Sequence, residues 1–135
     1  MPLSQIIYSS VPFGFDAATL SNILLDARRC NSRDAITGAL VCRRDIYMQF
    51  LEGEDAMVRT TLARIRRDDR HANVAVHYDA PADARLFAEW DMLHDPAHSW
   101  TWSEAEIASG ALDRASPREV LDIFAAISRR QISPP

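Results

Sequence analysis

The order of apolar and polar residues along the chain predicts alternating strands and helices. The first run rich in β-forming residues is Gln5–Ser10, and turn-forming residues follow it, so we predict a strand there. After Asp16, a candidate N-cap, apolar residues recur at the spacing of an amphipathic helix: Leu20, Ile23, Leu24 and Ala27. Asn31 would lie about 20° from Leu20 around such a helix, so we expect its amide to face the interior near the helix end.

The next two runs predict a β-hairpin. Ala35–Arg43 and Ile46–Glu52 are rich in β-forming residues and flank a tight polar connection. Because side chains alternate along a strand, the second run divides between two faces, with Tyr47, Gln49 and Leu51 on one and Ile46, Met48 and Phe50 on the other. Both faces carry large apolar side chains, so we expect the sheet to be covered on both sides.

A second helix and further strands follow the hairpin. The helix is predicted to start near Asp55, and its inner face carries Val58, Leu62 and Ile65. The remaining predicted segments are a strand at Asn73–Tyr78, a loop at Pro81–Arg85, and an edge strand at Leu86–Leu93 that carries Trp90 and Met92. This order is the split βαββαβ pattern, so we predict an α+β, ferredoxin-like fold with an antiparallel sheet and two helices on one face.

The C-terminal part is predicted to cover the other face of that sheet. After Pro96 the composition changes, and two more helices are predicted at 103–109 and 116–128. The last helix carries an apolar stripe of Val120, Leu121, Phe124 and Ile127, which could lie across Met48 and Phe50. We therefore divide the chain into a sheet-forming domain at 1–94 and a helical extension at 95–135.

One glutamine stands inside the otherwise apolar run of the third strand. Burying an unpaired amide costs on the order of a few kcal/mol, so Gln49 implies polar partners inside the fold or a polar ligand against it. Tyr8 of the first strand can share the helix-covered face with Gln49, and Asn31 approaches the same side. A phenol, two amides and apolar walls between two helices would suit a flat heterocycle such as the isoalloxazine of a flavin.

Each of these residues also has a structural explanation when it is taken alone. Gln49 and Tyr8 are compatible with ordinary core positions, and Asn31 with a helix C-cap. Arg64 and Asp68 lie four positions apart and would also suit an exposed ion pair on a helix. In the same way, Cys30, Trp90 and Met92 are compatible with plain packing.

Six short motifs, in order and on the predicted elements, favour the ligand interpretation: Ile6-Ile7-Tyr8-Ser9-Ser10, Arg29-Cys30-Asn31-Ser32-Arg33, Ile36-Thr37-Gly38, Gln49-Phe50-Leu51-Glu52-Gly53, Arg64-Ile65-Arg66-Arg67-Asp68-Asp69-Arg70-His71 and Trp90-Asp91-Met92. Through these motifs the chain, from about Leu3 to Leu93, closely resembles the BLUF family of blue-light sensors that use FAD. A single short motif would be weak support, but chance agreement of all of them at compatible spacing is implausible.

The resemblance implies a photoactive group of residues: Tyr8, Ser10, Gln49, Trp90 and Met92. Tyr8 would donate an electron and a proton to the excited flavin, while Gln49 would relay the proton and switch its hydrogen bonds. The amide has distinct donor and acceptor ends, so its rotation or tautomerisation gives two hydrogen-bond states toward one ring. The strand that carries Trp90 and Met92 would then be the element that changes on illumination.

The resemblance also implies the cofactor-binding residues: Tyr8, Ile23, Leu24, Cys30, Asn31, Gln49, Arg64 and Asp68. Asn31 would hold the polar edge of the ring, and Arg64 and Asp68 match positions near the ribityl and phosphate groups of FAD. FMN remains open as an alternative flavin. Cys30 stands where many members have Asn or His, a departure that we expect to alter dark recovery more than the photochemistry.

Composition narrows the classes of partner. The chain has 135 residues, of which 47% are hydrophobic, and a net charge of -4, which argues against nucleic-acid binding. Cys30 and Cys42 form no CxxC motif, and no signal peptide or membrane-length apolar stretch is evident, so we expect a cytoplasmic protein. His94 and His98 have a helical metal-binding spacing, but Pro96 lies between them and we expect no metal site.

The expected function is therefore a blue-light photoreceptor with non-covalent FAD. It would signal through its last strand and C-terminal helices to a separate protein, or by rearrangement of a homodimer or higher oligomer. No catalytic output domain is expected, so we do not predict an enzyme. The alternatives are a small flavin-dependent oxidoreductase, for which no GxGxxG fingerprint is present, and a flavin-binding regulatory module that does not sense light. An acylphosphatase-like hydrolase is disfavoured, because the 11–15 loop lacks an arginine for phosphate.

Overall fold

The chain forms the predicted α+β fold. The computed structural model describes residues 3–12, 17–43, 45–67, 71–88, 90, 92–95 and 102–130. Its elements, in chain order, are β1 (Leu3–Pro12), α1 (Ala17–Asp34), β2 (Thr37–Arg43), β3 (Ile46–Glu54), α2 (Asp55–Arg66), β4 (His71–Ala82), β5 (Leu93–Asp95), α3 (Glu104–Ala108), α4 (Ala111–Arg114) and α5 (Pro117–Arg130). Asp16, the predicted N-cap of α1, lies outside the described residues, as do Asp68 and the side chain of Leu20.

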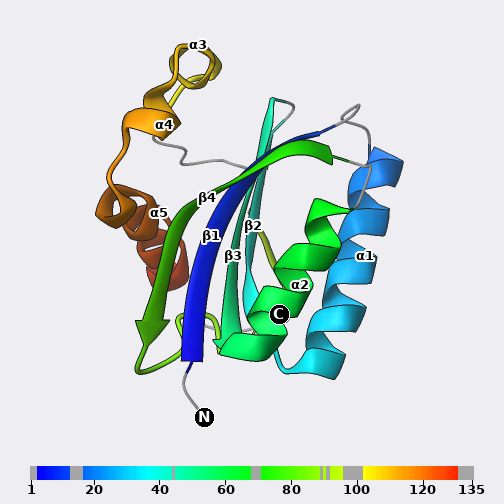
Figure 1. Cartoon of the computed structure of the whole chain (residues 1–135). Coiled ribbons are helices and arrows are strands. Elements are labelled where there is room, and N and C mark those ends of the chain that lie inside the picture. Colours follow the sequence, from blue (N-terminus) through cyan, green and yellow to red (C-terminus); the bar gives the residue numbers. More distant parts are fainter. Residues whose placement is uncertain are drawn as a thin grey trace.

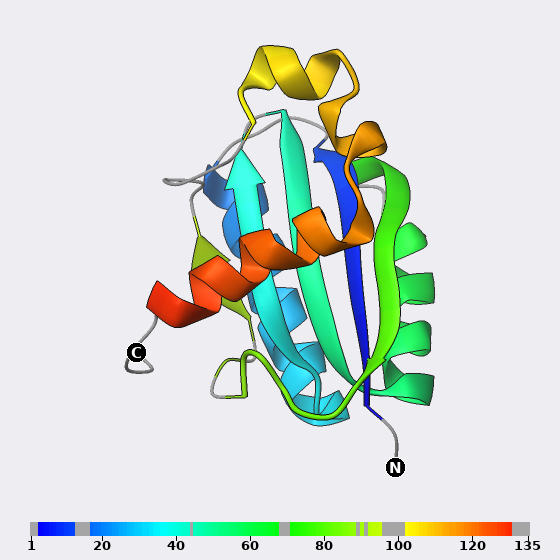
Figure 2. The same ribbon diagram turned by 90° about the vertical axis from the view of Figure 1, so that its left-hand side faces the viewer.

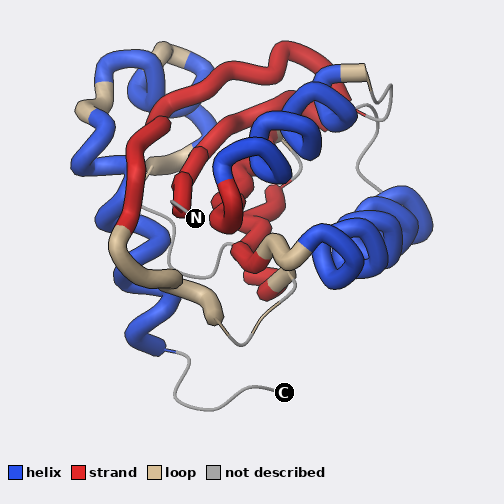
Figure 3. Tube along the Cα trace, turned by 60° about the horizontal axis from the view of Figure 1, so that its bottom comes forward, coloured by secondary structure: helices blue, strands red, loops and turns tan. Residues whose placement is uncertain are grey.

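The sheet is the middle of three layers. Its strand order is β4-β1-β3-β2-β5, with β1, β2, β3 and β4 paired antiparallel and β5 added parallel to β2. Helices α1 and α2 lie on one face (Figure 1). Helix α5 crosses the opposite face diagonally (Figure 2), and a view along the sheet separates the two helical layers (Figure 3). This arrangement confirms the predicted ferredoxin-like fold and its C-terminal helical cover.

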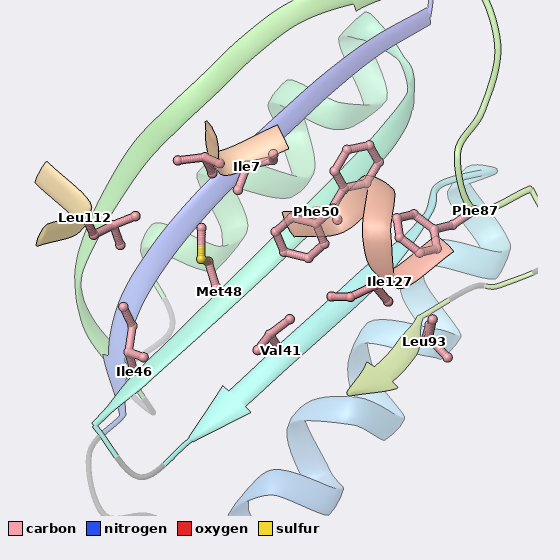
Figure 4. Close-up of a cluster of buried hydrophobic side chains, with 12 residues drawn as sticks. Ile7, Val41, Ile46, Met48, Phe50, Phe87, Leu93, Leu112 and Ile127 are labelled. Carbon is pink, nitrogen blue, oxygen red and sulfur yellow. The ribbon is translucent and has the colours of Figure 1, made fainter. Parts of the chain in front are cut away.

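The alternation along β3 divides the interior into two cores. Gln49 faces α1 and α2, as do Tyr47 and Leu51, the residues two positions before and after it. Tyr47 and Leu51 belong to one cluster of buried side chains on this face. Met48 and Phe50 face the other way and pack with α5, whose buried side chains are Val120, Phe124 and Ile127 (Figure 4). The Phe50 and Phe124 rings are 5.5 Å apart between centroids. The predicted stripe on the last helix therefore covers the face that the sequence assigned to it.

The C-terminal segment is fastened to the sheet at more than one point. Arg43, at the end of β2, donates from Nη1 to the backbone oxygen of Trp102 at 2.7 Å, and it also pairs with Asp45 across the hairpin turn. Leu112 of the short helix α4, which the sequence pattern did not predict, is buried in the same core as α5. The extension is thus fixed to the sheet through Trp102, α4 and α5, whereas α3 has no buried residue and lies beyond the strand ends (Figure 2).

Two boundary predictions are wrong. Pro81 and Ala82 belong to β4, because the Leu3↔Ala82 and Ser4↔Pro81 pairs continue the antiparallel ladder with β1. The run Leu86–Leu93 is not a strand: β5 begins only at Leu93, and Trp90 and Met92 precede it. The Trp90 N–H bonds the carbonyl of Phe87 at 3.0 Å, which is a turn and not a ladder contact.

Close approach of two strands requires a glycine at one position of this sheet. A Cβ on Gly38 of β2 would overlap the carbonyl oxygen of Phe50 on β3. The Gly38 N–H also donates to the carbonyl of Trp90 at 3.1 Å, so the segment before β5 is held on β2 at this point. The Ile36-Thr37-Gly38 motif therefore has a steric reason.

Candidate functional site

Two residues of the predicted site meet at the centre of the sheet. Tyr8 and Gln49 are direct partners in the antiparallel β1–β3 ladder, so their side chains leave the sheet on the same face. Both are buried, and the Tyr8 hydroxyl donates a hydrogen bond to Gln49 Oε1. With its oxygen occupied by the phenol, the amide nitrogen of Gln49 is left as a donor.

That nitrogen is directed to a methionine. Gln49 Nε2 donates to the sulfur of Met92 at 3.5 Å, and Met92 is only 1% exposed. A thioether sulfur is a weak acceptor, so this contact is a soft link compared with a bond to oxygen. The carbonyl of Met92 accepts from Arg28 Nε of α1 at 3.2 Å, so the helix also holds this segment.

A cavity of about 440 Å³ opens beside Tyr8 and Gln49, between the sheet and the two helices. Its volume lies in the range of cofactor and ligand sites in proteins. The residues that line it are Tyr8, Ile23, Asp26, Ala27, Arg29, Cys30, Asn31, Gln49, Thr61, Arg64, Ile65 and Arg67. The lining thus combines a buried phenol and amide with guanidinium groups.

Helix α1 supplies one wall because its residues recur on one face. Ile23, Ala27 and Cys30 are spaced by three or four positions, and Asn31 completes the face with its side chain 1% exposed. Beyond Asp34 the helix ends at Ala35, which has φ 56°, and the Ile36 N–H bonds the Asn31 carbonyl at 2.9 Å. The chain therefore turns directly into β2 below the cavity.

Helix α2 supplies the opposite wall through Thr61, Arg64 and Ile65. The guanidinium of Arg64 approaches Asp34 at 3.9 Å, which joins the two helices across the cavity end. A hydrogen bond from Arg33 holds the pKa of the Asp34 carboxyl below its usual range, with a smaller contribution from Arg64. Asp34 therefore stays ionised and keeps Arg64 oriented near the cavity.

The structure brings together most of the residues that the sequence proposed for the cofactor. Tyr8, Ile23, Cys30, Asn31, Gln49 and Arg64 line the same cavity. Leu24 lies in the core beneath it, buried but outside its lining. Ser10 is buried on β1 and shares the face of Tyr8, whereas Asp68 lies outside the described residues.

Trp90 and Met92 lie at and after the turn that replaces the predicted strand, and their side chains join different cores. In a strand, residues two apart share a face, and the two side chains would then be neighbours. Instead Met92 belongs to the core beside the cavity, while Trp90 packs against the core under α5. The structure places Met92, and not Trp90, against Gln49.

Besides the apolar Ala27 and Ile65, the lining contains four polar residues that were not predicted for the site: Asp26, Arg29, Thr61 and Arg67. A signal for Thr61 was present, since Thr61, Arg64 and Ile65 follow the i, i+3, i+4 spacing of one helix face. The others sit at helix positions that read as ordinary solvent-facing charges. Only the packing of α1 against α2 turns them toward a shared space.

The donor set of the cavity fits a flavin. The Thr61 hydroxyl is buried and has no hydrogen-bond partner within the described part of the chain, so it can serve a ligand. Gln49 and Asn31 supply amides for the polar edge of a ring, Ile23 and Ile65 supply apolar surface, and Arg64 supplies a cation for phosphate. The residues therefore match the polar edge, flat ring and anionic tail of such a molecule.

The described residues form neither a metal-binding cluster nor a membrane-spanning helix. No group of three or more His, Cys, Asp or Glu residues there is arranged to hold a metal ion. His98, one of the two histidines considered above, lies outside this part of the chain. None of the described helices is long and apolar enough to cross a membrane.

Comparison with known proteins agrees with this geometry. The family model described as "BLUF: Sensors of blue-light using FAD" matches residues 3–93. Photoactivated adenylate cyclase subunit beta of Euglena gracilis is 40% identical over 75 residues, which cover 54% of this chain and 9% of that protein. The corresponding subunit of Euglena longa is 41% identical over 75 residues, with the same coverage. The match thus spans less than a tenth of the length of these relatives.

Solved structures share the fold. The dark-state structure of BlrB, a BLUF protein, superimposes with a TM-score of 0.81 at 23% identity and covers 96% of this chain and 97% of its own. The ground state of BlsA gives 0.77 at 21% identity, over 93% of this chain and 87% of that one. A bacterial light-regulated adenylyl cyclase gives 0.68 at 22% identity, with 94% of this chain but only 36% of the cyclase covered. With a family model that matches about two thirds of its length, the chain belongs to the BLUF family of blue-light sensors.

Proposed function

We propose that this protein is a blue-light photoreceptor whose switch is the Tyr8–Gln49–Met92 chain of hydrogen bonds at the wall of the flavin cavity. Family membership gives the photosensory class and flavin binding. The observation that carries the specific proposal is that Gln49 accepts from Tyr8 and donates to Met92 while it lines the cavity.

A flavin bound there would supply absorption of blue light and an excited state able to take an electron. Tyr8 is a suitable donor because a phenol loses an electron more readily when a neighbouring group takes its proton, and Gln49 Oε1 already accepts that proton in a hydrogen bond. Rotation or tautomerisation of the amide would then exchange its donor and acceptor ends. The bond from Gln49 to the Met92 sulfur is weak, so its loss would oppose the exchange little.

We propose FAD and not FMN as the resident flavin. The lining of the cavity includes three arginines, Arg29, Arg64 and Arg67. The pyrophosphate of FAD has more acceptor oxygens than the single phosphate of FMN and spreads its charge over two phosphoryl groups, so it would engage more of these guanidinium groups.

We further propose that residues 1–94 form the sensory domain and 95–135 the output segment. The packing of α5 on the back of β3, at the 5.5 Å contact between Phe50 and Phe124, supports a role for the extension in output. Relatives that bear this domain are named as light-regulated cyclases. For this chain we propose that the signal passes to a separate protein or to a second copy of the chain.

The test is an absorption spectrum of protein purified in the dark, recorded before, during and after blue illumination. We expect a small, reversible red shift of an oxidised-flavin band, and its loss in Gln49→Leu with flavin still bound. Asn22→Leu, which replaces an exposed amide of α1 outside the cavity lining, is the control and should keep the shift. Bleaching without a shift, together with turnover of a reduced nicotinamide, would favour the oxidoreductase alternative.

A further inference from the structure

A buried carboxylate on β3 has no part in the switch proposed above. Glu52 lies three positions beyond Gln49 on the same strand, and its side chain is completely buried at 0% exposure. Buried carboxylates are rare unless several donors satisfy them, because their removal from water is costly. The groups that satisfy Glu52 therefore indicate why the residue is there.

Four donors converge on this carboxylate. Glu52 Oε1 accepts from the Leu86 N–H at 2.7 Å and from Gln5 Nε2 at 3.3 Å. Glu52 Oε2 accepts from the Phe87 N–H at 2.7 Å and from the Thr37 hydroxyl at 2.9 Å. Two consecutive backbone amides of the segment between β4 and β5 are thus bound by one side chain of the central strand. Bonds to an ionised acceptor are the strong class of hydrogen bond.

Arg85 reinforces the same attachment from the loop side. Its Nη1 donates to the Thr37 hydroxyl at 2.9 Å and to the backbone carbonyl of Glu52 at 3.2 Å, and its Nη2 donates to the carbonyl of Ala35 at 2.8 Å. The loop is therefore bound to β3, to β2 and to the end of α1 just before the chain turns toward Met92.

The attachment lies at one end of a short path to the switch. From Phe87 the chain turns through the Trp90 N–H bond to the Phe87 carbonyl, and the Trp90 carbonyl accepts from Gly38. Two residues later Met92 presents its sulfur to Gln49. Gln49 and Glu52 are on the same strand, so β3 holds both ends of the path, one through the Met92 sulfur and the other through the Glu52 carboxylate.

We infer that Glu52 is a positioning residue for the switch: its buried carboxylate anchors the loop at Leu86 and Phe87 and thereby sets the place of Met92 against Gln49. This inference deepens the proposed function, because it assumes that the contact between Gln49 and Met92 matters for light sensing. Glu52 touches neither the cavity nor its lining, so it acts only through the segment that it holds.

Glu52→Gln tests the anchor with almost no change of shape. The amide presents one oxygen and one NH₂ group, so at least one backbone N–H of the loop, or the Thr37 hydroxyl, would face a donor instead of an acceptor. Loss of one such buried bond increases the local opening equilibrium of the segment on the order of tenfold. Phe87 belongs to the core under α5, but the part of that core around Met48 and Leu112, on the other side of Phe50 in Figure 4, should remain closed.

The measurement is the rate at which hydrogen peroxide oxidises Met92 and Met48 in flavin-loaded protein kept in the dark, followed by peptide mass spectrometry. Both are buried, at 1% and 0% exposure, but Met48 lies on the α5 side of β3 and is reached only by wider unfolding. We expect Glu52→Gln to raise the Met92 rate about tenfold and leave Met48 unchanged. Glu54→Gln, on the same strand but outside the anchor, should change neither.

An equal rise for both methionines would overturn the inference, because Glu52 would then support only global stability. Unchanged oxidation of Met92 would overturn it as well. If Glu52→Gln does not fold, Thr37→Val removes one donor to the carboxylate and should give a smaller rise confined to Met92. The assay requires no photochemistry, so a missing light response would refute the proposed function without affecting this result.

Discussion

Thr61→Val should stabilise the flavin-free protein and weaken flavin binding. Thr61 is 1% exposed, and its hydroxyl has no hydrogen-bond partner in the described part of the chain, although the residue lines the cavity. An unsatisfied buried hydroxyl costs about 1–3 kcal/mol, which valine of similar shape would recover. A ligand that accepts from this hydroxyl would lose a bond worth about 1 kcal/mol or more, which is about fivefold in affinity.

Thr60→Val is the matched control for this substitution. Thr60 precedes Thr61 on α2, but it is exposed, and its hydroxyl bonds the Ala56 carbonyl at 2.9 Å within the helix. The two variants carry the same change of helix propensity, so the differences between them in stability and in FAD affinity report the effect of the cavity position alone. The assays are thermal unfolding of flavin-free protein and titration of FAD by fluorescence quenching. We expect Thr61→Val to unfold at a higher temperature and to bind FAD about five to thirtyfold more weakly than Thr60→Val.

The two results have opposite signs, and for this reason the experiment is demanding. General damage to α2 would lower both stability and affinity. Unchanged affinity of Thr61→Val would show that the hydroxyl does not reach the flavin, and the assignment of this wall of the cavity would then fail. A less stable flavin-free protein would show that the hydroxyl has a partner inside the chain.

Three further predictions concern the pH dependence of stability, the core under α5 and the role of Arg64 in the cavity. Burial lowers the pKa of His77, while the charge of Asp113 opposes this shift. The unfolded chain therefore takes up a proton at a higher pH than the folded chain, so the free energy of unfolding should fall as the pH drops from about 6.5 toward the folded pKa. Denaturant titrations at several pH values should show a smaller fall in His77→Gln. Phe124→Ala, at a fully buried ring, should cost about 3–5 kcal/mol in urea unfolding, and a loss below about 1 kcal/mol would contradict the packing of α5. In parallel titrations, Arg64→Gln should weaken the binding of FAD about tenfold and leave the binding of riboflavin, which has no phosphate, almost unchanged. Equal losses of affinity for both ligands would place Arg64 at the ring.

The central part of the site could be predicted from the sequence because strand geometry leaves few choices. A period of two assigns Gln49 and Phe50 to opposite faces, and the split βαββαβ order makes β1 and β3 neighbours. Tyr8 was therefore expected on the face of Gln49, where the structure places it. Helix periodicity supplied Asn31 in the same way, since its angle around α1 follows from its position.

The segment before β5 could not be predicted, because its burial comes from tertiary contacts and not from a local period. The run Leu86–Leu93 is apolar enough for a strand, but before β5 its described backbone bonds go to the Glu52 side chain, to a turn and, at one point, to Gly38 of β2. Glu52 itself reads in the sequence as the polar end of β3. Its role depends on a loop more than thirty positions away, a distance at which residue spacing gives no information.

The same segment connects the two faces of the sheet through two adjacent residues. Met92 belongs to the core beside the cavity, and the next residue, Leu93, belongs to the core under α5 together with Ile127 (Figure 4). A shift of Met92 away from Gln49 would therefore move Leu93 through a single peptide unit. The alternative route through β3 itself requires displacement of a strand that is paired on both sides and buried along almost its whole length. Because that displacement would break two ladders, we expect any coupling between Gln49 and the C-terminal helices to pass through Met92 and Leu93.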